Sequence, residues 1–162
     1  YSLGLGYVAG FRDEELKELG QGALFHDIGK RHVDVNIICK DGPLDDDEWK
    51  QMQQHPQFGL LILNNHDISD AIKACCFEHH ESFTGNGYPQ KLQGDEIHPM
   101  ARIVAITDTY DALTTKRSYN DPMTPTDALQ FMDEKLRAKY DARLMDAMKD
   151  VLFKMAEAKK RA

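Results

Sequence analysis

The chain has 162 residues and a formal net charge of −7, from 20 basic and 27 acidic residues. This length fits one domain with a sizeable hydrophobic core. The negative charge argues against a surface that binds duplex nucleic acid, because such a surface needs a basic stripe that displaces counterions from the phosphates. A small anionic ligand is still compatible with this charge if bound metal ions supply positive charge locally.

The three cysteines, Cys39, Cys75 and Cys76, form no CxxC pair. An odd number with two adjacent members is typical of reduced thiols that serve as packing residues in a cytosolic protein. No apolar run reaches the roughly 18 residues that a membrane span requires. We therefore predict a cytosolic (cytoplasmic) domain. Because the chain begins at Tyr1, we expect it to belong to a longer protein with a sensory or regulatory domain on its N-terminal side.

Residues 13–25 form the first predicted helix, because apolar residues recur at helical spacing and three acidic residues open the first turn, where the helix dipole favours anions. We expect this helix to be buried and to end near Asp27. Gly29 is placed to relieve the chain at the C-terminal end of the helix. Residues 33–42 are predicted to form a loop or a short strand.

The middle of the chain carries clear signals of helix starts and stops. A capping-box pattern at residues 45–48 begins a helix, and Pro56 is expected to break or kink it directly after His55. A further helix begins near residue 70 and leads to His79-His80-Glu81.

The C-terminal half continues with helices after a long loop at residues 83–99, and a loop of this length is commonly functional. Residues 100–115 are strongly apolar and predict a central buried helix, and further helices are expected at 125–136 and 143–158. No internal repeat and no alternating strand pattern stands out. The sequence therefore predicts an all-α, single-domain helical bundle of about six or seven helices.

Six polar residues lie beside apolar runs or at predicted helix ends. Burying a lone carboxylate is costly unless it is paired or bound to a metal ion. Helices that each deliver one or two such groups can build a metal site in the core of a bundle. Imidazole and carboxylate ligands together suit a divalent first-row metal. The six candidates are His26, Asp27, His55, His79, His80 and Asp108.

Each candidate alone also has an ordinary structural interpretation. A pair such as His26-Asp27 is typical of a capped helix end, and a single His such as His55 is usually hydrogen-bonded or solvated. His79 and His80 point about 100° apart on a helix, so both serve one site only near the helix terminus. The occurrence of all six in one short chain favours a metal site.

Several motifs occur in a fixed order over nearly the whole chain: residues 26–30, 40–44, 55–56, 79–81, 85–89 and 102–119. In this order they resemble the HD-GYP subgroup of the HD-domain metal-dependent phosphohydrolases. The resemblance implies an HD-GYP domain over residues 1–162 with a metal site in its core. The family usually carries a further His ligand on a helix roughly thirty residues before the HD pair, a position that falls before Tyr1. This ligand is therefore expected either to lie on a preceding segment or to be lost.

The activity implied by the resemblance is hydrolysis of the bacterial messenger cyclic di-GMP to linear pGpG or GMP. A metal-bridging hydroxide would attack phosphorus in line. The implied cofactors are two or three divalent metal ions, iron or manganese. In this arrangement Asp27 would bridge two ions, His26 and Asp108 would complete one of them, and His55, His79 and His80 would complete the other.

The resemblance also implies contacts to the substrate. Asp27 and Lys30 would be the catalytic residues. Lys30 and Arg117 would hold phosphate, Lys as a point charge and Arg with a planar fork, and Lys116 would contact the substrate beside them. Tyr88 would shape the guanine-nucleotide pocket or a partner surface, and the implied partner is a diguanylate cyclase-type or other signalling domain.

Some positions depart from the family pattern. Thr84 stands where an Asp is usual, Ser118 and Asn120 replace a proline and a basic residue, and Asp34-Val35 replaces Pro-Asp. These departures concern substrate affinity more than the metal site. Two alternatives therefore stay open. One is a catalytically impaired cyclic dinucleotide receptor or protein-interaction module, and the other is a phosphohydrolase acting on a different nucleotide, such as a hybrid cyclic dinucleotide.

Overall fold

The computed structural model describes residues 1–116 and 121–161, with side chains up to residue 155. All its regular elements are helical, which confirms the all-α prediction. Within the described residues the only β-type pairing is one bridge between Thr84 and Gln93.

The α-helices are α1 (Ser2–Val8), α2 (Asp13–Phe25), α3 (Val35–Ile38), α4 (Asp46–Met52), α5 (His55–Leu63), α6 (Asp70–Glu78), α7 (Pro99–Thr114), α8 (Pro125–Phe131) and α9 (Ala142–Arg161). Shorter turns are the 3₁₀ helices η1 (Ile28–His32), η2 (Gly94–Glu96) and η4 (Arg137–Lys139), and the π-helical η3 (Met132–Leu136).

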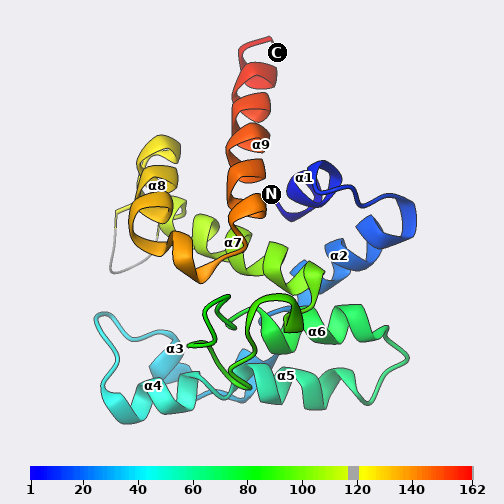
Figure 1. Ribbon diagram of the computed structural model, residues 1–162. Helices are drawn as coiled ribbons and strands as arrows, with labels where there is room; N and C mark the ends of the chain where they lie inside the picture. Colours follow the sequence, from blue (N-terminus) through cyan, green and yellow to red (C-terminus); the bar gives the residue numbers. More distant parts are fainter. Residues whose placement is uncertain (117–120, 162) are drawn as a thin grey trace.

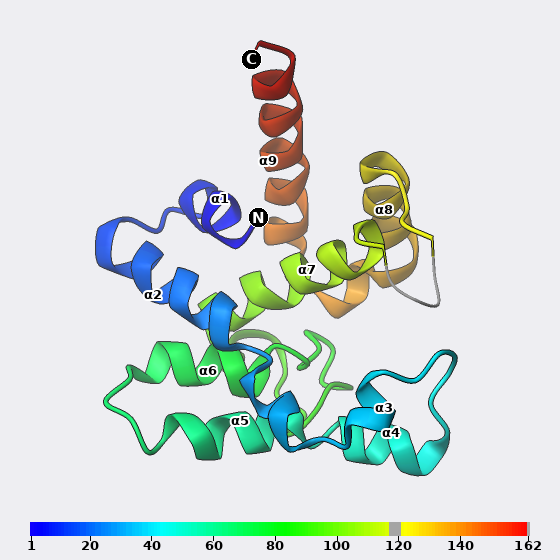
Figure 2. The ribbon, with the colours of Figure 1, turned by 180° about the vertical axis from the view of Figure 1, so that it is seen from behind.

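Helix α7 crosses the middle of the molecule, with α1, α8 and α9 on one side and α3 to α6 on the other (Figures 1 and 2). It begins where expected, since Pro99 occupies its first turn and the His98 side chain accepts a hydrogen bond from the backbone N–H of Met100. Its apolar residues Ile103 and Ile106 are almost completely buried. The central buried helix predicted from residues 100–115 is therefore confirmed.

The contact between η1 and α5 is unusually close because glycine stands on both sides. A Cβ atom at Gly29 would lie 1.9 Å from the carbonyl oxygen of His55 and 2.4 Å from the backbone nitrogen of Gly59. No side chain fits in this space, so the two backbones touch directly. Gly29 therefore serves this close approach. Its predicted role at the end of α2 is wrong, because three residues separate it from Phe25, the last residue of that helix.

Two local predictions about the central segments are wrong. Residues 33–42 contain the short helix α3 instead of a strand, because the Asp34 side chain caps it by accepting a hydrogen bond from the backbone N–H of Asn36. The break near Pro56 precedes His55 instead of following it. Pro56 is the second residue of α5, where its missing N–H has no helical partner to lose.

The N-terminal residues 1–11, for which no helix was predicted, contain α1. Its glycines lower the intrinsic helix propensity of this segment, and contacts with the rest of the fold stabilise the helix. Leu5 is fully buried in the core, and the Ser2 hydroxyl hydrogen-bonds that of Thr107 on α7. No helix in the described part of the chain is long and apolar enough to cross a membrane.

We predict that Gly29→Ala destabilises the fold, because the new methyl group would press on two backbone atoms that cannot rotate away. Overpacking of this kind costs about 1–3 kcal/mol. Denaturant unfolding should show a midpoint lowered by the corresponding amount at an unchanged slope.

Gly20→Ala is the matched control, since Gly20 lies within α2 and its added Cβ would meet only the tip of the exposed Leu3 side chain, at 3.3 Å. This variant should be neutral or more stable by up to about 1 kcal/mol, the usual gain of alanine over glycine in a helix. Equal stability of the Gly29→Ala variant and the wild type would contradict the inferred backbone contact.

Candidate metal centre

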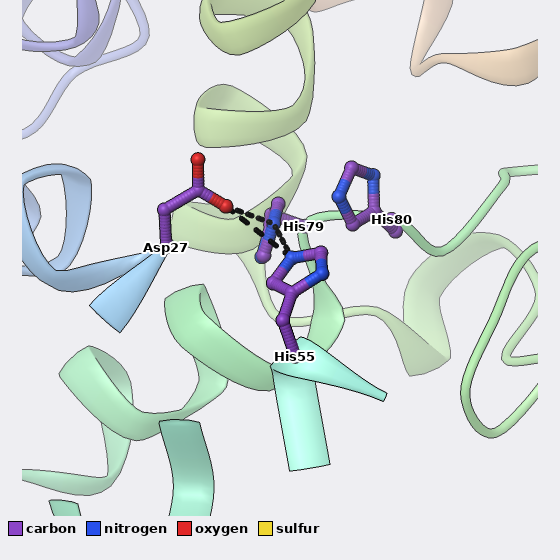
Figure 3. A group of neighbouring side chains, drawn as sticks. All are labelled: Asp27, His55, His79 and His80. Carbon is purple, nitrogen blue, oxygen red and sulfur yellow. Dashed lines mark hydrogen bonds and ion pairs between the residues drawn. The ribbon is translucent and has the colours of Figure 1, made fainter. Parts of the chain in front are cut away.

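The six candidate residues converge at one place, where the ends of α2 and α6 and the start of α5 meet α7. His26 and Asp27 follow the end of α2, His55 opens α5, and His79 and His80 follow α6, while Asp108 lies within α7. The packing of α2 on α6, and of η1 on α5, brings these helix ends together. Figure 3 shows the Asp27 carboxylate and the rings of His55, His79 and His80 gathered at the centre of this group.

The two oxygens of the Asp27 carboxylate face different partners. Oδ1 lies 3.3 Å from Nε2 of His55 and 3.8 Å from Nε2 of His79. Oδ2 lies 3.3 Å from Nε2 of His26, and that nitrogen is 3.6 Å from Oδ1 of Asp108. Asp27 therefore stands between a histidine group on one side and the His26–Asp108 pair on the other.

Three of the histidines are held by backbone carbonyls through Nδ1. The acceptors are the carbonyl oxygens of Ala23 for His26 at 2.7 Å, Met52 for His55 at 2.8 Å, and Cys76 for His79 at 2.9 Å. A hydrogen bond at Nδ1 fixes the ring orientation and leaves Nε2 as the metal-binding atom. The helix ends therefore aim three Nε2 atoms into the same space.

The charges of the cluster are set by burial and by the two carboxylates. Burial opposes a charge on His26, but the nearby carboxylates of Asp108 and Asp27 outweigh it and raise the pKa of His26 to about 10. Burial raises the pKa of the Asp27 carboxyl group, but the adjacent His26 lowers it by more. The pKa of Asp27 therefore lies well below its usual range. Burial lowers the pKa of both His79 and His80. These two imidazoles are therefore neutral near pH 7, the form that binds a metal ion.

Two polar atoms at the centre of this group lack partners. Nε2 of His26 and Oδ1 of Asp27 are buried without a hydrogen bond among the described residues. Buried polar atoms are normally satisfied, and leaving them unpaired costs free energy. One ligand atom from each of Asp27, His55, His79 and His80 lies within 4.8 Å of the other three. This donor set fits a divalent metal ion.

A cavity of about 750 Å³ opens over the cluster. Its wall includes His55, His80 and Asp108 on the cluster side. The wall also carries the aromatic side chains of Trp49 and Tyr88, whose ring centroids lie 6.3 Å apart. The volume is that of a typical small-molecule site. A ligand in this cavity would therefore contact the cluster directly.

The predicted substrate residues have different positions. Lys30 lines the cavity, and its ammonium group donates a hydrogen bond to Oδ2 of Asp27. Tyr88 also lines the cavity, and its ring stacks on His80. Lys116 is exposed just after α7 and is not among the described residues of the cavity wall. Arg117 lies outside the described residues, so its role stays a prediction.

Two residues of this region were not predicted. The Trp49 side chain is 47% exposed and lines the cavity. The only signal in the sequence is that it is the single tryptophan, four residues after a predicted N-cap. Glu81 is almost fully buried. Its position directly after the two histidines could have marked it, since a buried carboxylate needs partners.

Comparison with protein families gives one match over most of the chain, in which the model of the HD domain matches residues 2–144. Among curated relatives, the 3'3'-cGAMP-specific phosphodiesterase 2 of Vibrio cholerae is 40% identical over 122 residues, which are 74% of this chain and 23% of that protein. The cyclic di-GMP phosphodiesterase response regulator of Xanthomonas campestris is 33% identical over 141 residues, which are 86% of this chain and 37% of that protein.

A solved structure of an HDG"Y"P protein from Bdellovibrio bacteriovorus has the same fold. It superposes with a TM-score of 0.77 at 21% sequence identity, over 93% of this chain and 48% of that chain. The chain therefore spans less than half the length of each of these proteins.

We predict that a divalent metal ion raises the melting temperature of chelator-treated protein, because a ligand that binds only the folded state stabilises it. Addition of Mn²⁺ in increasing amounts should shift the thermal midpoint upward, as followed by circular dichroism. Asp27→Asn should remove most of this shift, since Asp27 faces both sides of the cluster. Asp67→Asn changes an exposed carboxylate far from the cluster and should keep the shift. An equal shift in both variants would place the ion elsewhere.

Proposed function

Because the chain belongs to the HD domain family, we propose that it is a metal-dependent phosphodiesterase that hydrolyses a cyclic dinucleotide such as cyclic di-GMP. The observation that carries the proposal is the Asp27 carboxylate, which faces histidine nitrogens on two sides beneath a cavity large enough for a nucleotide. The names of the relatives, which are phosphodiesterases for cyclic di-GMP and 3'3'-cGAMP, support the choice of substrate.

We infer that the site holds two divalent ions, iron or manganese. His26 and Asp108 would bind one ion together with Oδ2 of Asp27. The other ion would be bound by Oδ1 of Asp27 and by the rings of His55, His79 and His80. Metal ions in such sites supply Lewis acidity and lower the pKa of bound water. The mixed nitrogen and carboxylate donors suit iron and manganese.

The remaining residues would bind and orient the substrate. The Lys30 ammonium group is the cation of the cavity wall beside Asp27, so it is suited to meet a phosphate oxygen once bound ions satisfy the carboxylate. The rings of Tyr88 and Trp49 offer apolar surface to a base. Lys116 and Arg117 are proposed to hold the second phosphate. Hydrolysis adds water across one phosphorus–oxygen ester bond and gives the linear dinucleotide pGpG, and a second hydrolysis gives GMP.

A second candidate substrate is the hybrid cyclic dinucleotide 3'3'-cGAMP. The observation that favours it is the 40% identity to a relative whose name specifies this substrate.

A signalling domain that docks on the loop at residues 85–89, such as a diguanylate cyclase, stays a prediction. A cytosolic location of the domain also stays a prediction.

We predict that protein loaded anaerobically with Fe²⁺ or Mn²⁺ converts cyclic di-GMP or 3'3'-cGAMP to a linear product, which chromatography would detect. Asp108→Asn should lower kcat by more than about 100-fold, because even residues that only support metal ligands commonly cost 10- to 100-fold. Asp150→Asn, an exposed change on α9, should keep full activity.

Absence of turnover with either substrate and either metal would contradict the proposal. If calorimetry then detected binding of the dinucleotide without cleavage, the chain would be a receptor. Cleavage of other nucleotides alone would indicate a phosphohydrolase with a different substrate.

We also predict that dinucleotide binding changes the fluorescence of Trp49, which is the only tryptophan of the chain and lines the cavity. Stacking of a base on an aromatic side chain contributes about 1–3 kcal/mol. Trp49→Leu should therefore weaken binding roughly tenfold, whereas Trp49→Phe keeps an aromatic face and should lose less. Equal affinities of the leucine and phenylalanine variants would show that no base stacks there.

A further inference from the structure

The Glu81 carboxylate is buried at the edge of the cluster and binds only backbone N–H groups. The side chain belongs to a residue that is 3% exposed. Oε1 accepts hydrogen bonds from the backbone nitrogens of Gln90 at 2.6 Å and Lys91 at 3.1 Å, and Oε2 accepts one from Leu92 at 3.1 Å. No described Lys, Arg or His side chain forms an ion pair with it. These three N–H groups therefore compensate its charge.

Consecutive N–H groups that converge on one anion form a concave cradle, typically where a right-handed residue is followed by a left-handed one or where the chain turns. Lys91 is left-handed, with a φ of 60°. A non-glycine residue adopts this conformation at a cost, so the surrounding contacts must hold it there. Hydrogen bonds from N–H groups to an ionised carboxylate are about twice as strong as neutral ones. Glu81 thus fixes the loop conformation at residues 90–92.

The same loop is docked on the segment that carries His80. A Cβ atom at Gly87 would lie 2.3 Å from the backbone nitrogen of Ser82 and 2.5 Å from Cα of Glu81, so the two backbones touch. The backbone nitrogen of Tyr88 donates a hydrogen bond to the carbonyl oxygen of His80 at 3.2 Å. The Tyr88 ring then stacks on the His80 ring, with centroids 4.8 Å apart and an interplanar angle of 23°.

His80 needs this support because it differs from the other histidines of the cluster. His26, His55 and His79 each have Nδ1 bonded to a backbone carbonyl. No hydrogen bond holds the His80 ring within the described part of the chain. The His80 ring stacks on Tyr88 and lies near the rings of His55 and His79, at centroid distances of 5.0 and 4.1 Å. The orientation of His80 therefore depends on where the loop places Tyr88.

We propose that Glu81 is a positioning residue: by binding the N–H groups of residues 90–92, it holds Tyr88 against His80 and so fixes the orientation of this metal-binding ring. This inference rests on the proposed metal site, and it adds a residue that contacts neither metal nor substrate. The path from Glu81 to His80 runs through the loop backbone and the Tyr88 ring, and each link can be changed separately.

The test measures Mn²⁺ affinity by titration and, in metal-free protein, the fluorescence of Trp49, whose ring lies beside Tyr88. Glu81→Gln has nearly the same shape but replaces one acceptor oxygen by an NH₂ group, so at least one of the three N–H groups loses its partner. We expect Mn²⁺ affinity to fall about tenfold, as is common when a residue supporting a metal ligand is changed. We also expect the Trp49 emission to shift before any metal is added.

Two variants at Tyr88 separate positioning from simple loss of stability. Tyr88→Leu removes the stacked ring and should lower Mn²⁺ affinity as Glu81→Gln does, whereas Tyr88→Phe keeps the ring and should retain the wild-type affinity. The double variant Glu81→Gln/Tyr88→Leu should lose no more than either single variant, because both act on His80 along one path.

Glu96→Gln is the matched control, because Glu96 also accepts a backbone hydrogen bond in this loop, from Gln93 at 2.8 Å, but is exposed. It should change neither Mn²⁺ affinity nor Trp49 emission. Wild-type Mn²⁺ affinity in folded Glu81→Gln, or losses that add in the double variant, would overturn the inference. If Glu81→Gln does not fold, wild-type affinity in Tyr88→Leu would overturn it.

Failure of the proposed metal site looks different, since wild-type protein would then bind no Mn²⁺. In that case, measurements on metal-free protein still test whether Glu81 positions His80. Histidine side-chain resonances in NMR spectra should show one ring, His80, shifted in both Glu81→Gln and Tyr88→Leu. Unchanged resonances in both variants would refute the role of Glu81.

Discussion

The Asp27 carboxylate is the group on which the rest of the site depends. One of its oxygens faces His55 and His79, and the other faces His26, so a single side chain joins two halves of the cluster. A carboxylate can do this only if it is held where two sets of helix ends meet. The direct backbone contact at Gly29 provides that position, because it brings the residues after α2 against the first residue of α5.

The buried polar centre is supported by two kinds of contact. Helix packing through small residues sets the positions of the helix ends, as where Gly59 meets the sulfur of Cys76 on α6. Backbone carbonyls then orient three of the histidine rings. In the loop after His80, the buried Glu81 carboxylate accepts backbone hydrogen bonds and the Tyr88 ring stacks on His80.

Local signals in the sequence predicted most helices and the composition of the candidate site. The resemblance to HD-GYP proteins, drawn from the order of the motifs, is confirmed by the family match and the named relatives. The helices α1 and α3 were missed because their stability comes from contacts of Leu5 with the core and from the Asp34 cap, and neither residue stands out in a periodic pattern. Pro56 was misjudged because a proline signals a helix start and a helix break equally well.

The sequence by itself determined which donor groups are available, since the types of residues 26, 27, 55, 79, 80 and 108 and their place beside apolar runs are local properties. Only the tertiary structure decided how they are used. The division of the Asp27 oxygens between two sides, the exposure of Trp49 to the cavity, and the path from Glu81 through Tyr88 to His80 all depend on contacts between separate segments. Such contacts follow from how helices and loops pack, and packing is a property of the whole chain.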